Sequence, residues 1–239
     1  MKRSKLIGFD RRLELDWLDM AADCVNQGLS QQDSTDRLRS YLSKRIPNIP
    51  AQKKTLTVLQ GIWIKVPESL YGLRDSGAML LKNNGKSVRL PIHYGMCLAS
   101  YPFFGSVVHQ IGRLNRLQGE IKTSQVKRRV VEKYGDTERV RRSVRHVVQS
   151  LNTWQVLQMV KPGLYTINKP NDVFLSEIRL WLIEALLHSQ DGKGLSVSDV
   201  RDENRLFPFI VNSSASELSK NPRLTITRQN VDSELITLR

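Results

Sequence analysis

Residues 121–167 read IKTSQVKRRVVEKYGDTERVRRSVRHVVQSLNTWQVLQMVKPGLYTI, and this stretch decides the predicted fold of the middle of the chain. Apolar residues recur at spacings of three and four on both sides of the Gly135-Asp136 pair, which predicts two helices joined by a tight turn. We expect these helices over residues 124–134 and 137–150, with Asp136 as the cap of the second.

Two further helices and a hairpin flank this pair. The apolar spacing predicts helices over residues 91–100 and 103–118, the second ending at a glycine. After the helix over 137–150, a Lys-Pro-Gly turn at residues 161–163 separates two short apolar runs, which is typical of a β-hairpin. The predicted order is therefore helix, helix, tight turn, helix, hairpin.

That order, across about residues 103–168, resembles the winged helix-turn-helix family of DNA-binding domains. The resemblance covers roughly a quarter of the chain and rests on a pattern of spacings and caps. It implies that the helix over 137–150 lies in the major groove. It also implies that the hairpin over 155–167 is the wing, which contacts the DNA backbone or the minor groove.

The helix over 137–150 is strongly two-sided. On a helical wheel Val140, Val144, Val147, Val148 and Leu151 fall on one arc, and the polar side chains lie mostly opposite. Arginine can bond guanine with two donors and glutamine can bond adenine, so Arg142, Arg145 and Gln149 are the expected base readers. Lysines and other arginines of the unit would hold phosphates. The full expected DNA-binding set is Lys122, Lys127, Arg128, Arg139, Arg142, Arg145, His146, Gln149 and Lys161.

The composition agrees with a polyanionic partner. The 239 residues carry a formal net charge of +14, and residues 113–169 hold 13 of the 37 basic side chains but only 4 of the 23 acidic ones. Concentrated positive charge attracts nucleic acid, although it also suits an acidic protein partner or a solvated helix face. No apolar run is long enough to span a membrane and no signal-peptide pattern begins the chain, so we expect a cytoplasmic protein.

The regions on either side of the middle unit predict a mainly helical protein with small β-hairpins. Residues 1–90 contain four amphipathic helices, which favour a small N-terminal bundle. We expect Asp10 to cap the first of them and Ser30 to open the second. Residues 170–239 contain a long apolar helix, short helices and a closing hairpin, so they predict an α+β domain or a second winged-helix-like fold. We therefore expect domains over residues 1–90, 91–169 and 170–239.

Nothing in the sequence indicates a catalytic, metal or cofactor site. The two cysteines and four histidines do not have metal-ligand spacing, and no glycine-rich phosphate loop is present. Three acidic residues at 199, 202 and 203 could bind magnesium. His93 lies four positions from Cys97, so these two could form a catalytic Cys/His pair. Caps and core packing are the commoner roles of such residues. We therefore expect a protein that is not an enzyme and holds no cofactor.

Two functions fit these observations best. The first is a DNA-binding protein that reads double-stranded DNA through the winged helix-turn-helix. The second is an architectural subunit of a larger nucleic-acid assembly, whose N-terminal and C-terminal domains dock partner proteins. The third is an enzyme whose site residues are dispersed along the sequence, and no motif supports it.

Overall fold

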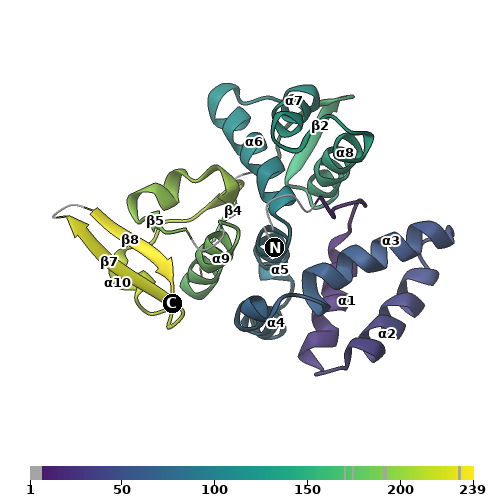
Figure 1. Ribbon diagram of the computed structural model, residues 1–239, viewed down its shortest axis with the longest axis horizontal. Helices are drawn as coiled ribbons and strands as arrows, with labels where there is room; N and C mark the ends of the chain where they lie inside the picture. Colours follow the sequence, from purple (N-terminus) through teal and green to yellow (C-terminus); the bar gives the residue numbers. More distant parts are fainter. Residues whose placement is uncertain (1–6, 170, 174, 191–192, 231–232) are drawn as a thin grey trace.

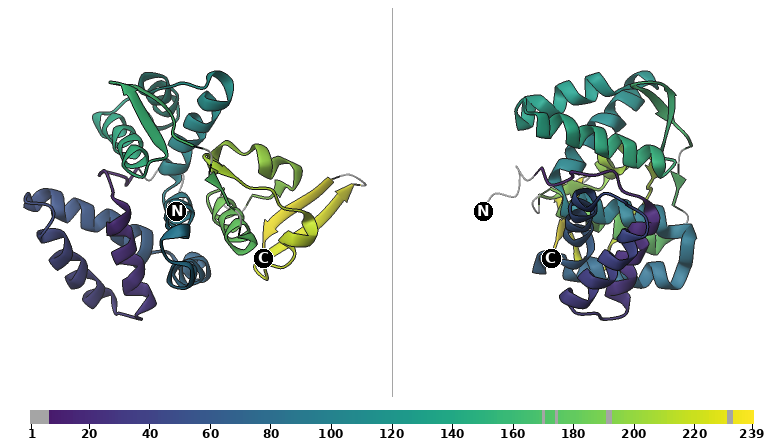
Figure 2. Two further views of the ribbon diagram at one scale, coloured as in Figure 1. Left: turned by 180° about the vertical axis from the view of Figure 1, so that it is seen from behind. Right: turned by 90° about the vertical axis from the view of Figure 1, so that its right-hand side faces the viewer.

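The computed structural model describes residues 7–169, 171–173, 175–190, 193–230 and 233–239. The protein is mainly helical with small sheets, as predicted. Figure 1 shows three groups of elements around a central helix, α5: the first helices, the α6–α8 group, and the C-terminal strands with α9. The two further views in Figure 2 show the same three groups.

The N-terminal region contains the four predicted helices. Ser30 caps the second of them, because its hydroxyl accepts a hydrogen bond from Asp33 N at 3.1 Å. The expected cap at Asp10 is wrong: the first helix begins at Leu15, and the Asp10 carboxylate bonds to a helix far along the chain. The elements are α1 (Leu15–Asn26), α2 (Gln31–Ser43), α3 (Ile49–Leu59), the π-helix η2 (Gln60–Ile64), the 3-10 helices η3 (Glu68–Leu70) and η4 (Gly85–Val88), and α4 (Tyr71–Asn84).

The middle region contains the predicted helices and hairpin, together with one additional strand. The additional strand, β1, has only two residues, which is too short to show a period of two. It completes an antiparallel sheet in the order β1-β3-β2, with a register shift between Met159 and Lys161. The elements are α5 (Arg89–Ser100), α6 (Pro102–Gln118), β1 (Ile121–Lys122), α7 (Thr123–Tyr134), α8 (Glu138–Thr153), β2 (Leu157–Lys161) and β3 (Leu164–Ile167).

The C-terminal region combines one long helix with short helices and strands, and the closing hairpin is confirmed. Its three-stranded antiparallel sheet has the order β5-β8-β7, so in both three-stranded sheets the last strand lies in the middle. Strands β4 and β6 form a separate two-stranded parallel sheet. The elements are β4 (Asn171–Asp172), α9 (Ser176–His188), β5 (Leu195–Ser196), η5 (Ser198–Asp202), η6 (Asn204–Leu206), β6 (Phe209–Ile210), α10 (Ala215–Leu218), β7 (Leu224–Asn230) and β8 (Ser233–Leu238).

Helix α5 connects these regions. Nine consecutive residues, 91–99, are buried, and α5 packs against α1, α4, α6 and α9. Helix α9 is fixed to α4 as well, because Trp181 Nε1 donates a hydrogen bond to the Leu73 carbonyl at 2.9 Å. One continuous apolar core therefore runs through all three of the expected domains. None of the helices described is long and apolar enough to cross a bilayer.

Candidate nucleic-acid interface

Helix α8 begins at a tight turn after α7. Gly135 ends α7 with a φ of +89°, a backbone conformation that favours glycine. The cap of α8 is Thr137, whose hydroxyl accepts a hydrogen bond from Val140 N at 3.2 Å. The expected cap Asp136 is wrong by one position, because its carboxylate accepts hydrogen bonds from the Arg141 guanidinium instead.

The apolar face of α8 is buried as predicted. Val140, Val144, Val147 and Leu151 have no solvent exposure, and Val148 has 1%. Helix α7 contributes Val126 and Val130 to the same core. This burial fixes the rotation of α8, so its opposite side is presented to solvent.

The exposed side of α8 carries three arginines and a glutamine: Arg141, Arg142, Arg145 and Gln149. Arg142 has a loose contact with Glu138, with 3.8 Å between Nη2 and Oε1, and its side chain is 51% exposed. Among the described residues Arg145 has no ion-pair partner. Exposed pairs such as Arg142–Glu138 contribute little stability, so these guanidinium groups can exchange their present contacts for an anion. We call these four residues the α8 stripe.

Arg141 is a member of this stripe that the sequence reasoning missed. Its guanidinium donates to both carboxylate oxygens of Asp136, with Nε 2.6 Å from Oδ1. This hydrogen bond and the adjacent positive charge lower the pKa of Asp136. Asp136 lies five positions before Arg141 in the sequence, where it indicates a helix cap and gives no sign of this pairing.

Two of the expected DNA-binding residues lie on a different flank of α8, which packs against residues 9–13. Arg139 Nη2 lies 3.2 Å from Asp10 Oδ2, and Ser143 Oγ donates to Asp10 Oδ1 at 3.1 Å. Farther along, Ser150 Oγ accepts a hydrogen bond from Leu13 N at 2.9 Å.

His146 is on that flank and does not belong to the α8 stripe. Both of its ring nitrogens are buried and have no hydrogen-bond partner among the described residues. Burial lowers the pKa of His146, and the nearby charge of Arg11 adds to the effect. The DNA contact expected of His146 therefore stays a prediction, and the residue is not counted in the α8 stripe.

The remaining expected residues are exposed on α7 and the sheet. Lys127 and Arg128 lie on the outer side of α7. Lys122 on β1 and Lys161 on β2 both pair with Leu164 of the central strand, so the sheet brings these two lysines into one row. The start of α7 is tied to the hairpin turn, because Thr123 N donates to the Gly163 carbonyl at 2.9 Å.

The candidates for other chemistry are explained by local contacts. His93 Nε2 lies 2.7 Å from Asp19 Oδ1, and burial raises the pKa of the Cys97 thiol, so this pair has packing partners rather than a nucleophile geometry. The Arg116 guanidinium contacts Asp202, and Glu203 pairs with Arg205. In the part of the chain that the structure describes, no group of three His, Cys, Asp or Glu side chains could hold a metal ion.

Comparisons with known proteins add no relative. No family model, curated protein or solved structure matches the chain. The function is therefore inferred from the geometry of the chain itself.

Proposed function

We propose that α6 to β3 is a winged helix-turn-helix and that the protein binds double-stranded DNA through it. The observation that carries the proposal is the α8 stripe, a row of exposed arginines and a glutamine on a helix whose other side is anchored in the core. The element order, with the last strand in the middle of the sheet, supports this arrangement. No catalytic step is part of the proposal.

In this proposal α8 lies in the major groove and the hairpin over 155–167 is the wing. Arg142, Arg145 and Gln149 have donors that match guanine and adenine edges, and each well-placed contact contributes about 1–3 kcal/mol of discrimination. Arg141 would also contact the bases when its guanidinium exchanges the Asp136 carboxylate for DNA. Lys122, Lys127, Arg128 and Lys161 are exposed cations without base-reading geometry, so they would contact phosphates and set the register. Arg139 would do the same at the flank, beside Asp10.

The test is a fluorescence-anisotropy titration of the full chain with double-stranded DNA at several salt concentrations. Contacts to about 5–8 phosphates give a steep dependence, near −0.9 in log–log slope per contact. Replacing Arg142 and Arg145 by Ala removes two contacts and should weaken binding about tenfold or more for each. Arg39→Ala on α2, which also removes an exposed arginine, is the matched control and should bind as the wild type does.

Two outcomes would contradict the proposal: no binding at micromolar protein, or equal loss of affinity in Arg39→Ala and the double variant. Competition between a selected site and random DNA then separates the two forms of the function. A sequence-reading protein prefers its site by several orders of magnitude, whereas the alternative, an architectural subunit, binds both DNAs alike.

A further inference from the structure

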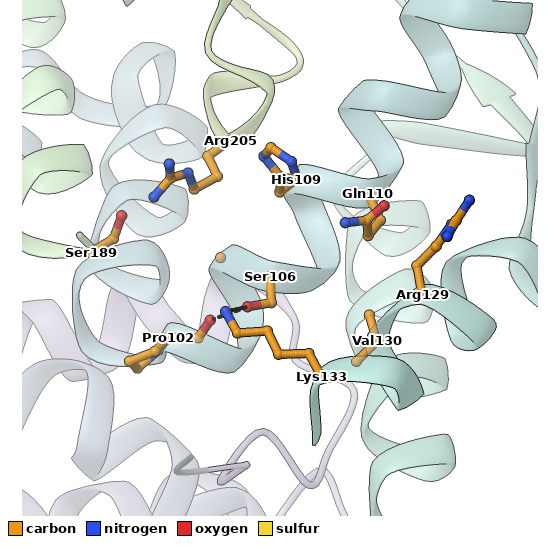
Figure 3. Close-up of a pocket in the computed structure, with 10 residues that line it drawn as sticks. Pro102, Ser106, His109, Gln110, Arg129, Val130, Lys133, Ser189 and Arg205 are labelled. Carbon is orange, nitrogen blue, oxygen red and sulfur yellow. Dashed lines mark hydrogen bonds between the residues drawn. The ribbon is translucent and has the colours of Figure 1, made fainter. Parts of the chain in front are cut away.

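A cationic cavity of about 280 Å³ lies between α6, α7 and η6 (Figure 3). Arg129 and Lys133 of α7, His109 of α6 and Arg205 of η6 line it, and none of the described side chains in its lining is a carboxylate. In Figure 3 Arg205 and Ser189 line one side, Gln110 and Arg129 the other, with Ser106 and Lys133 between them. No residue of α8 or of the sheet takes part, so this cavity is separate from the α8 stripe.

Arg205 is held at the edge of the cavity by Glu203. The Glu203 carboxylate accepts hydrogen bonds from Arg205 Nε at 3.0 Å and from Nη2 at 2.9 Å. This pair uses one edge of the guanidinium and leaves the Nη1 group out of it. The segment can lie this close to α6 because residue 112 is a glycine. A Cβ at that position would come within 2.3 Å of the Asn204 carbonyl oxygen.

Lys133 is held by neutral groups. Its Nζ donates to Ser106 Oγ at 3.0 Å, and no carboxylate among the described residues forms an ion pair with it. An ammonium group has three donors, so two remain for a ligand. Arg129 contacts Glu132 at 3.3 Å, but both side chains are about half exposed, and such a pair is readily exchanged.

We infer that this cavity binds a phosphoryl group carrying two negative charges. Arginine forks match phosphate oxygens with two donors, and a lysine ammonium adds a compact charge. Ser106, Ser189 and Gln110 supply neutral polar groups around the same space. At about 280 Å³ the cavity is slightly smaller than typical small-molecule sites, which begin near 300 Å³, and this size suits a phosphate or a small phosphate monoester. This site is independent of the proposed DNA binding.

The test is isothermal titration calorimetry of the full chain at constant ionic strength with sodium chloride. One arm uses inorganic phosphate and the other a nucleoside monophosphate. The wild type should bind at least one of them, and Lys133→Met and Arg129→Met should each weaken that binding tenfold or more. Arg39→Met on α2 is the matched control, because it removes an exposed arginine with a similar i,i+3 ion pair but lies outside the cavity lining and the proposed DNA-binding set, and its affinity should equal that of the wild type.

Binding in the first arm identifies free phosphate as a sufficient ligand, and binding only in the second identifies a phosphate monoester as the required ligand. Both support the site provided that they depend on Lys133. Circular dichroism of each variant establishes that it is folded. The inference is overturned if the wild type binds neither probe, if folded Lys133→Met binds as the wild type does, or if Arg39→Met loses as much affinity as Lys133→Met.

Discussion

At the scale of single residues, Val144 and Arg142 are two positions apart on α8 and have opposite surroundings. Val144 has no solvent exposure, whereas the Arg142 side chain is 51% exposed. Val144→Asp places an unpaired carboxylate in the core and should lower the free energy of unfolding by about 4 kcal/mol or more, a large part of the stability of a domain. Urea denaturation followed by circular dichroism measures this loss.

Arg142→Asp is the matched control, since it introduces the same carboxylate on the exposed side of the same helix. It should keep a wild-type unfolding midpoint and lose affinity for DNA. If Val144→Asp is stable and Arg142→Asp unfolds, the orientation of α8 described above is reversed.

Glu203 makes part of the stability depend on pH. Burial would raise the pKa of Glu203, but the nearby His109 imidazole and hydrogen bonds from Arg205 outweigh it and lower the pKa from 4.5 to about 2. Because the folded pKa is the lower one, this contribution is complete above pH 4.5 and is lost as the pH falls towards 2. After allowance for solvent screening it amounts to about 2 kcal/mol. Urea denaturation at a series of pH values should show Glu203→Gln losing less stability than the wild type across that window.

At the scale of elements, the turn between α7 and α8 depends on one glycine. Gly135 has a φ of +89° and a ψ of 155°, a region that is nearly closed to other residues, so Gly135→Ala should cost about 1–3 kcal/mol. Gly119, which ends α6, has a φ of 69° and a ψ of −14° in the ordinary left-handed region that asparagine also adopts. Thermal unfolding should therefore show a clear loss in Gly135→Ala and a smaller one in Gly119→Asn. Equal losses would mean that the turn is not specifically strained.

The helices were predictable because their apolar spacing and end residues are local. The buried face of α8, the cap at Ser30 and both hairpins follow from residues that are neighbours in sequence. The errors came from partners that are distant in sequence. Asp10 looked like a cap but contacts Arg139, and His146 looked exposed but has both ring nitrogens buried. The cationic cavity combines α6, α7 and η6, and no local pattern predicts that Arg205 and Lys133 line the same cavity.

At the scale of the whole molecule, an arginine held by a buried carboxylate joins the C-terminal region to α4. Glu184 has no exposure and accepts hydrogen bonds from Arg223 Nε at 2.6 Å and Nη2 at 3.0 Å, while Nη2 also donates to Ser76 on α4. Arg223→Ala leaves the carboxylate buried without its guanidinium and should cost about 3 kcal/mol or more. Glu184→Gln should cost less, because the Arg223 side chain is 41% exposed and can turn to water. Urea denaturation of both variants tests this order, and the reverse order would contradict it.

The burial of α5 also limits how this protein can be altered by recombination. A domain that exchanges freely between proteins carries a complete core and a polar outer surface. Here Phe103, Phe104 and Val107 of α6 are shielded within a core shared with α5 and the rest of the chain. Residues 102–167 cut from this protein and fused to another would expose an apolar patch of the kind that causes aggregation. The unit from α6 to β3 would therefore be transferable only together with α5 or a substitute helix that covers the same surface.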